Sequence, residues 1–347
     1  MNAVRVLVAE AEGSAPREAG AVMWVWADDF SGTIGGGALE LEAIAVARGM
    51  LRDGAPEWHR ELRAYPLGPS LGQCCGGMVR LLYEVCTGDV GRAPSPPHLL
   101  VPRHPLSLAR RGRGEEAPAL IVRPVVPGVP PEIVRDRRHV ADWPVAALRA
   151  VRQTLSGERP RATLLIQGSK GAPGWIVEPE PNPPHPLYLY GAGHVGRAVV
   201  RVLTDLPFAI TWVDVAADRF PETLPPNATA VIATDPAAIA AAAPSQALHL
   251  IMTFSHALDL SIAHAVLSRQ FAWAGLIGSA TKRARFSKRL LEAGIDAAAL
   301  GRLHCPIGIG GITGKEPAMI AISVAAQLAA WSGSAGAALT GEDRQHG

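Results

Sequence analysis

The sequence predicts an α/β protein with two domains, the second of which is a Rossmann-type, doubly wound parallel-sheet domain. The chain has 347 residues, which exceeds the usual size of one hydrophobic core. After residue 186, apolar runs of strand length alternate with helical patterns, which is typical of a parallel sheet covered by helices. The proline-rich segment 179–186 precedes this alternation and marks the expected domain boundary.

The first domain is expected over residues 1–181 and contains a Gly-rich helix start and a Cys-Cys loop. Apolar runs predict strands that together form one sheet, at residues 4–9, 21–27, 61–65, 78–85, 119–126, 162–167 and 175–177. Apolar residues at helical spacing predict helices at 38–51 and 145–155. Residues 87–117 are rich in Pro, Gly and Arg, so we expect a flexible insertion or linker there.

The second domain is expected over residues 186–332. Its predicted strands are 187–190, 209–213, 229–232, 248–253 and 274–277. Its predicted helices are 194–203, 258–269, 281–293 and 317–330. The segment 333–347 is expected to be a disordered tail.

Composition excludes several classes of function. A net charge of +2 gives no basic footprint for binding DNA or RNA. No apolar run reaches the ~20 residues of a membrane span, and the N-terminus lacks the pattern of a secretory signal, so we expect a cytoplasmic protein without membrane association. Four cysteines are too few for a disulfide scaffold.

Glycines at a predicted strand-to-helix turn form a dinucleotide-binding fingerprint. Gly191, Gly193 and Gly196 have the expected spacing, with His194 at the helix start, and Asp214 ends the next predicted strand. Without side chains, these glycines allow a tight turn, close approach to a phosphate and close packing of helix on strand. The fingerprint favours a phosphate-bearing ligand, although a Rossmann core kept for packing alone would show the same pattern.

A second run of glycines, Gly35, Gly36 and Gly37, precedes the first predicted helix. Bare N–H groups at such a position can hold an anion or a partner's backbone. A helix entrance that must turn sharply is an equally good interpretation.

Polar residues also follow two strands of the second domain. Ser279 and Lys282 open a predicted helix, where Ser279 can cap and Lys282 adds charge. His256 and Asp259 follow the carboxyl end of another strand, the edge where α/β sheets place ligands, although a lone His there is more often structural. Each pair is therefore a candidate with a structural alternative.

Adjacent cysteines, Cys74 and Cys75, lie between Gln73 and the pair Gly76 and Gly77. Glycines let the backbone approach a ligand, and backbone N–H groups lower a thiol pKa. A soft thiolate suits a soft metal or a transferable sulfur. Neighbouring cysteines are badly placed to chelate one tetrahedral ion, which counts against a structural zinc site and makes metal- or sulfur-handling thiols the better interpretation.

Seven segments together resemble the XdhC/CoxI family of bacteria. They are Gly13–Gly20, Gly32–Glu40, Leu67–Gly77, Gly191–Gly196, Gly275–Lys282, Cys305–Ile309 and Gly314–Ala318. The resemblance covers most of the chain, and residues 87–117 lie outside it.

The resemblance implies a cofactor-binding chaperone more than a turnover enzyme. Such a protein would bind molybdenum cofactor (molybdopterin), protect it while a cysteine desulfurase supports its sulfuration, and insert it into the molybdenum subunit of apo-xanthine dehydrogenase. A homodimer is expected. Glycine-rich helix starts can bind the phosphate of the cofactor. The thiolate of Cys74 or Cys75 can bind its metal centre. Cys75 is slightly favoured because it directly precedes Gly76.

Three alternatives remain open. An NAD(P)-binding oxidoreductase would use the fingerprint and Asp214, but it has no evident use for the segment from Gln73 to Gly77. A thiol protein that relays persulfide would not hold the metal. A purely structural assembly partner would tolerate the loss of both thiols.

Overall fold

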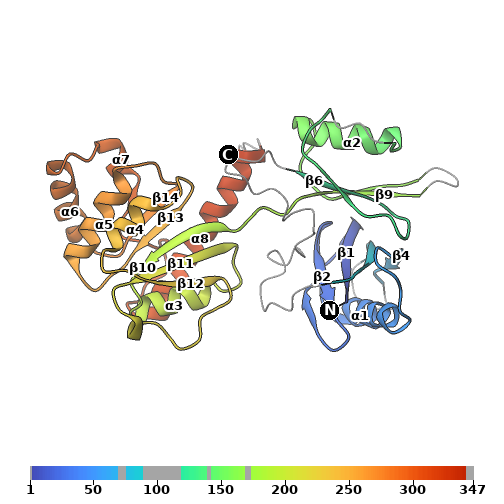
Figure 1. The fold of residues 1–347 in the computed structure, drawn as a ribbon, viewed down its shortest axis with the longest axis horizontal. Helices are drawn as coiled ribbons and strands as arrows, with labels where there is room; N and C mark the ends of the chain where they lie inside the picture. The colour runs from blue at the N-terminus through green and yellow to red at the C-terminus, as the bar shows by residue number, and fades with distance from the viewer. Residues whose placement is uncertain (1, 69–75, 89–118, 139–141, 169–172, 341–347) are drawn as a thin grey trace. The chain divides into compact units, whose positions relative to one another are not determined.

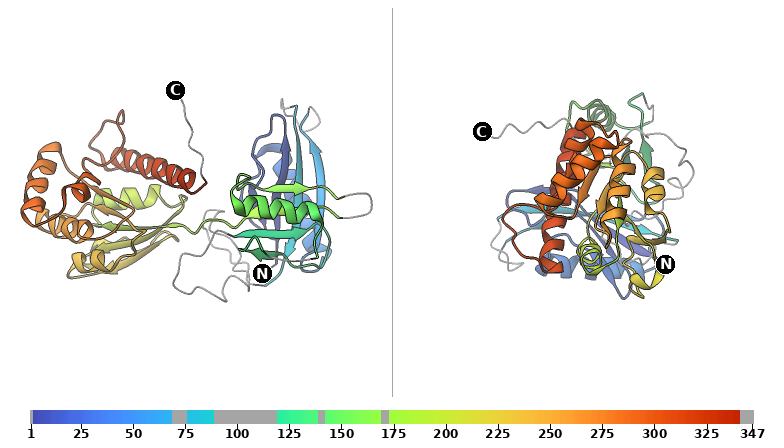
Figure 2. Two further views of the ribbon diagram at one scale, coloured as in Figure 1. Left: turned by 90° about the horizontal axis from the view of Figure 1, so that it is seen from above. Right: turned by 90° about the vertical axis from the view of Figure 1, so that its left-hand side faces the viewer.

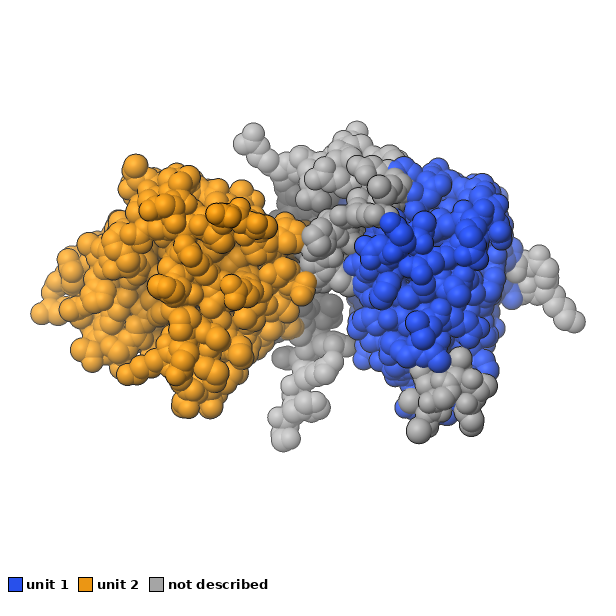
Figure 3. All heavy atoms as spheres, turned by 90° about the horizontal axis from the view of Figure 1, so that it is seen from below, with its two compact units in different colours: residues 1–182, 340–342 blue, residues 183–339, 343–347 orange. Residues whose placement is uncertain are grey.

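The computed structural model describes residues 2–68, 76–88, 119–138, 142–168 and 173–340. The chain divides into two compact units, one formed chiefly by Met1–Asn182 and the other by Pro183–Leu339. Figure 1 follows the elements along the chain, and Figure 3 colours the two units. Each unit buries hydrophobic clusters of its own.

A five-stranded antiparallel sheet forms the first layer of unit 1. In sheet order its strands are β3 (Phe30–Gly32), β2 (Val22–Val25), β1 (Ala3–Glu12), β5 (Met78–Cys86) and β4 (Arg60–Pro66). Helix α1 (Gly37–Arg52) covers one face, because Leu39, Ala43 and Ala47 recur at helical spacing and are fully buried against it.

A second antiparallel sheet follows in unit 1, so the prediction of a single sheet is wrong. Its strands, in order, are β7 (Glu132–Val134), β6 (Leu120–Pro124), β9 (Trp175–Pro179) and β8 (Leu164–Ile166). Helix α2 (Val145–Ser156) packs on one face through Ala147 and Val151. Ile176 packs with Leu7 and Leu82 of the first sheet. Apolar runs alone do not say which strands pair.

Buried charges also connect the two sheets of unit 1. The Glu84 carboxylate accepts from Arg60 Nε at 2.5 Å on the neighbouring strand and from Arg123 of the second sheet. Arg123 Nη2 continues to Glu178 Oε1 at 2.8 Å, which Arg5 Nη2 reaches at 2.9 Å. Burial by itself would raise the pKa of Glu84, but Arg123 and Arg60 hold that pKa below its usual value. Each charge therefore depends on a partner in another strand.

A six-stranded parallel sheet forms the core of unit 2. In sheet order its strands are β12 (Ala228–Ile232), β11 (Phe208–Asp214), β10 (His185–Tyr190), β13 (Leu248–Ile251), β14 (Trp273–Leu276) and β15 (Leu303–His304). Numbered from β10 along the chain, this is the Rossmann order 3-2-1-4-5-6. The order reverses between β10 and β13, which is where such sheets bind ligands. The predicted Rossmann fold is confirmed.

Helices cover both faces of this parallel sheet (Figures 1 and 2). Helices α3 (His194–Val202) and α8 (Pro317–Thr340) share one hydrophobic cluster with the sheet. Helices α4 (Pro236–Ala242), α5 (His256–Leu267) and α6 (Ala280–Glu292) share the other. None of the helices in the described part of the chain is long and apolar enough to cross a membrane.

Several elements of unit 2 differ from the sequence predictions. Helices α4 and α7 (Ala297–Gly301) and strand β15 were not predicted. Asp235 followed by Pro236 is a helix-start signal that the sequence analysis overlooked. Helix α8 continues to Thr340, so its predicted end at Ala330 is wrong, and it enters the segment expected to be a tail. Glycine and serine after Trp331 have low helix propensity, which explains the error.

Candidate functional site

The turn that follows β1 lies against the glycine end of the Cys-Cys loop. A Cβ added to Gly77 would lie 2.5 Å from the Glu12 carbonyl oxygen and 2.6 Å from that of Ser14. Around Gly76, by contrast, a Cβ would meet nothing within 4 Å. Gly77 is therefore required for packing, whereas no described residue packs against Gly76 in this way. Gln73, Cys74 and Cys75 lie outside the described residues.

The same turn also contacts the start of α1. Gly35 has φ of 128°, and a Cβ there would lie 2.5 Å from Pro16 Cγ. Gly36 and Gly37 also have positive φ, 75° and 65°. A side chain at any of the three would be strained. The turn after β1 thus touches both glycine-rich segments of unit 1.

A carboxylate completes the entrance of α1. Glu40 Oε2 accepts from Thr33 Oγ1 at 2.7 Å and from the N–H groups of Ile34 and Gly36, each at 3.1 Å. This negative charge already satisfies the electrostatic preference of the helix start. The geometry therefore favours a sharply turned helix entrance over a second anion at Gly36.

In unit 2, each fingerprint glycine has a distinct environment. Gly191 has φ of 117°, and a Cβ there would lie 2.4 Å from the Met252 carbonyl oxygen. A Cβ at Gly196 would lie 2.1 Å from the Gly191 carbonyl oxygen, so this glycine lets α3 pack on the preceding turn. A Cβ at Gly193 would meet nothing within 4 Å. Of these three glycines, Gly193 is the one that faces open space.

Helix α3 starts at this open space without a side-chain cap. Gly193 is its N-cap, and both Gly193 and His194 are exposed. The caps of α4, α5, α6 and α7 are Asp or Ser side chains that accept helix N–H groups. The first N–H groups of α3 are therefore left for water or an anion.

Asp214, at the end of β11, is buried and already hydrogen-bonded. Its Oδ2 accepts from Ala192 N at 2.6 Å, and its Oδ1 accepts from Val215 N at 2.7 Å. Arg219 Nε lies 3.4 Å from Oδ1, and the Arg219 guanidinium lies over the Phe254 ring, 4.1 Å from its centroid. Both carboxylate oxygens therefore already accept hydrogen bonds from the protein, which weakens the interpretation of Asp214 as a ribose ligand.

Lys282 and Asp259 form an ion pair at the carboxyl ends of β13 and β14. Lys282 Nζ donates to Asp259 Oδ2 at 2.6 Å and to the Ile277 carbonyl oxygen at 2.8 Å. Asp259 is fully buried, and its Oδ1 accepts from Thr253 N at 2.9 Å and Thr253 Oγ1 at 2.7 Å. Ser279 Oγ accepts from Lys282 N at 3.2 Å, so Ser279 is the cap of α6.

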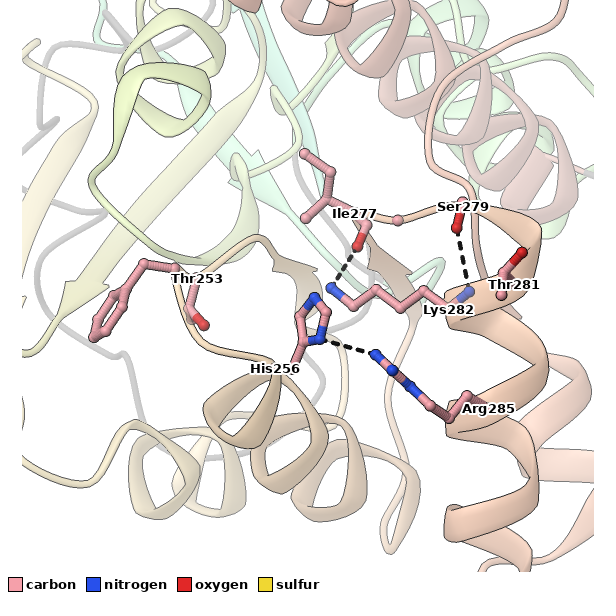
Figure 4. A pocket seen from close by; sticks show the side chains of 9 residues that line it. Thr253, His256, Ile277, Ser279, Thr281, Lys282 and Arg285 are labelled. Carbon is pink, nitrogen blue, oxygen red and sulfur yellow. Dashed lines mark hydrogen bonds between the residues drawn. The ribbon is translucent and has the colours of Figure 1, made fainter.

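A cavity of about 440 Å³ lies above this ion pair. His256 on α5 and Arg285 on α6 point toward each other at its edge (Figure 4), and Arg285 Nη2 donates to His256 Nδ1 at 2.8 Å. Arg285 and Arg219 were not among the predicted site residues. Arg285 lies three residues after Lys282, a spacing that puts both side chains on one helix face.

The two described cysteines are poor candidates for chemistry. Cys86 and Cys305 are buried free thiols. Burial raises the pKa of each, so both are held as neutral thiols. Within the described ranges there is no group of three or more His, Cys, Asp or Glu side chains that could hold a metal ion. The thiol hypothesis therefore rests on Cys74 and Cys75 alone.

Comparison with known families identifies both units. A model of the XdhC and CoxI family matches residues 2–65, and a model of the XdhC Rossmann domain matches residues 187–328. The chain belongs to the XdhC and CoxI family. Gly35 to Gly37, the fingerprint glycines, Asp214, Ser279 and Lys282 lie inside the matched ranges. The segment from Gln73 to Gly77 lies outside them.

Two known proteins differ in how much they share with this chain of the XdhC and CoxI family. The uncharacterized protein YqeB of Escherichia coli (strain K12) is 32% identical over 143 residues, which are 41% of this chain. The match spans only 26% of the length of YqeB. A crystal structure from Bacillus halodurans, described as a xanthine dehydrogenase, has a TM-score of 0.66 at 20% identity. It covers 96% of this chain and 92% of its own, which shows a shared fold.

Proposed function

We propose that this chain is an accessory protein of xanthine dehydrogenase. In this proposal it binds molybdenum cofactor in the cytoplasm, protects it while a cysteine desulfurase supplies sulfur, and inserts it into the apo-enzyme, with two copies of the chain forming a homodimer. Membership of the XdhC and CoxI family supports the general role. The main observation in favour of cofactor binding is the uncapped start of α3 beside the open space at Gly193.

The fit to the cofactor can be judged from the open space at Gly193. A phosphate needs several donors and room for its oxygens, and the uncapped start of α3 at the exposed residues Gly193 and His194 offers both. Gly191 and Gly196 act indirectly, by holding the turn and letting α3 pack closely. When bound, the cofactor would supply the molybdenum centre and the phosphate, while the chain would supply donors and shelter.

The thiol part of the proposal concerns Cys74 and Cys75, with Gln73, Gly76 and Gly77 as the adjoining backbone. Gly77 is anchored against the turn after β1, and Leu67 N donates to the Gly77 carbonyl oxygen at 2.7 Å. Among the residues that the structure describes, a Cβ at Gly76 would meet no atom within 4 Å. An anchored loop end next to open backbone would suit a thiolate that contacts the metal or carries sulfur to it.

The first test replaces Gly193 with valine. Because the site is open, Gly193→Val should fold normally yet block the approach of a phosphate to α3. We expect less molybdenum and less pterin fluorescence to copurify, at an unchanged melting temperature. Gly301→Val is the matched control, since a Cβ at Gly301 in the same unit also meets nothing within 4 Å. Unchanged cofactor retention in Gly193→Val would refute phosphate binding at α3.

The second test replaces Cys74 and Cys75 with alanine, singly and together. Xanthine dehydrogenase coexpressed with the variants should assemble its other centres but contain less cyanide-releasable sulfur, with the larger loss for Cys75→Ala. Cys86→Ala serves as the control, because this buried thiol has a raised pKa and should affect stability only. Wild-type sulfur content with both cysteines replaced would leave a chaperone that binds phosphate without using a thiolate.

A second candidate function is an NAD(P)-binding oxidoreductase. The Rossmann strand order and Arg219 beside Asp214 favour it, since an arginine there can pair with a 2′-phosphate. The two backbone donors already on Asp214 count against a ribose contact. Titration with NADH, followed by nicotinamide fluorescence, separates the candidates. A persulfide relay would instead purify without molybdenum from cells that make the cofactor.

A further inference from the structure

The cavity above the Lys282–Asp259 pair is distinct from the open start of α3. It lies beyond the carboxyl ends of β13 and β14, where α5 and α6 begin, and has a volume of about 440 Å³. We propose that this cavity binds a phosphoryl group through Arg285, Thr281 and the first backbone N–H groups of α5 and α6. The proposal goes beyond cofactor chaperoning and does not depend on it.

The charge balance of the cavity favours an anion. The ammonium of Lys282 is neutralised by Asp259, 2.6 Å away and fully buried beneath the cavity. The guanidinium of Arg285 instead donates to a ring nitrogen of His256, and in the described residues it has no carboxylate partner. Arg285 therefore leaves one uncompensated positive charge at the cavity, to which an oxyanion can bind.

Two helix starts add donors on the same side. Ser255 Oγ and Ser279 Oγ each accept the N–H group three residues on. The N–H groups before those, at the first two positions of α5 and α6, have no intrahelical partner. Both helices exceed ten residues, 12 and 13, so each contributes a positive partial charge at its start. Thr281 also lines the cavity (Figure 4), and its hydroxyl is a further group able to donate.

The side chains that line the cavity do not suit a metal cation. A metal cation has no available carboxylate among the described residues that line the cavity, because Asp259 is fully buried and its oxygens already accept from Lys282 and Thr253. A tetrahedral oxyanion can accept from a guanidinium and from both helices at once. Thr253, which lines the cavity, also packs against the fingerprint turn, because a Cβ at Gly191 would lie 3.1 Å from Thr253 Cα. The cavity thus adjoins the fingerprint turn.

The test measures binding of inorganic phosphate and of AMP to the purified full chain by isothermal titration calorimetry. Arg285→Gln should weaken binding about tenfold, the loss typical of one charge-assisted hydrogen bond. Thr281→Val, which keeps the side-chain shape, should weaken it by a smaller factor. Lys288→Gln is the control, because it also removes one positive charge from α6, but from a side chain that is 79% exposed and near Glu292.

Two results support the proposal and differ only in the source of the phosphoryl group. Binding of both probes, weakened by Arg285→Gln, indicates the phosphoryl group of a larger ligand, and binding of inorganic phosphate alone, likewise weakened by Arg285→Gln, indicates the free ion. No saturable binding of either probe, or equal losses in Arg285→Gln and Lys288→Gln, overturns the proposal. The maturation role has its own test in the molybdenum and pterin that copurify with Gly193→Val, so the failure of one proposal can be told from the failure of the other.

Discussion

Replacing Glu84 with glutamine tests how unit 1 is held together. The Glu84 carboxylate is buried and accepts from Arg60 in its own sheet and from Arg123 in the other. A glutamine side chain would keep the size of the glutamate but could offer only one oxygen as acceptor. Two buried guanidinium groups would then share a neutral amide, and the remaining carboxylate of the network, Glu178, also pairs with Arg5.

The expected cost follows from this uncompensated charge. Removing one partner of a buried ion pair typically costs about 3–5 kcal/mol of unfolding free energy. Glu61→Gln is the control, because Glu61 pairs with Arg63 on the surface, where its side chain is 35% exposed. An exposed pair contributes about 0–1 kcal/mol. Glu84→Gln should therefore lose several times more stability than Glu61→Gln.

Urea unfolding at a series of pH values provides the assay. The folded-state pKa of Glu84 is lowered from 4.5, so its stabilising contribution is present above pH 4.5 and is lost as the pH falls through the folded pKa. Wild-type stability should decline in that acid range more steeply than that of Glu84→Gln. Equal losses for Glu84→Gln and Glu61→Gln at neutral pH would refute the argument that the buried network stabilises unit 1.

Three further predictions concern unit 2. Burial lowers the pKa of His249 from 6.5 to about 4. The contribution of His249 to the free energy of unfolding should therefore fall by about 1.4 kcal/mol per pH unit as the pH drops between those values. His249→Phe should remove this contribution to the pH dependence, as measured by urea unfolding at several pH values. Gly191→Ala should lose at least about 1–3 kcal/mol in thermal unfolding, because its positive φ strains any side chain and a Cβ there would lie 2.4 Å from the Met252 carbonyl oxygen. Gly193→Ala should change stability by less than about 0.5 kcal/mol. Lys282→Met should lower the free energy of unfolding by about 3–5 kcal/mol, and adding Asp259→Asn should restore part of that stability. If the losses of the two single variants, measured by urea unfolding, simply add in the double variant, the ion pair is contradicted.

The sequence predicted unit 2 better than unit 1, for a physical reason. Parallel strands joined by helices leave little choice of topology, because each crossover must be right-handed and cover a face. The alternation after residue 186 was therefore enough to predict the Rossmann fold. In unit 1, antiparallel strands far apart in sequence choose among many partners. The separation into two sheets depends on pairings such as β6 with β9, which no local pattern encodes.

The candidate site shows the same division between local and distant information. Spacing predicted the fingerprint turn, because its glycines act on residues close in sequence. It could not predict that Glu40 would satisfy the entrance to α1, or that Asp259 would neutralise Lys282 across 23 positions. Arg285 could not be predicted as a site residue, because an arginine on an exposed helix face is common and only the structure shows the cavity beside it.

The cross-sheet charges of unit 1 have a consequence for cooperativity and for the choice of protein fragments. The family match at residues 2–65 ends before β5, the strand that pairs with both β1 and β4. A fragment ending after β5 would still lack Arg123 and Glu178, leaving Glu84 with arginines from its own sheet only. We expect the two sheets to unfold in a single transition, so the smallest fragment that folds should extend through β9.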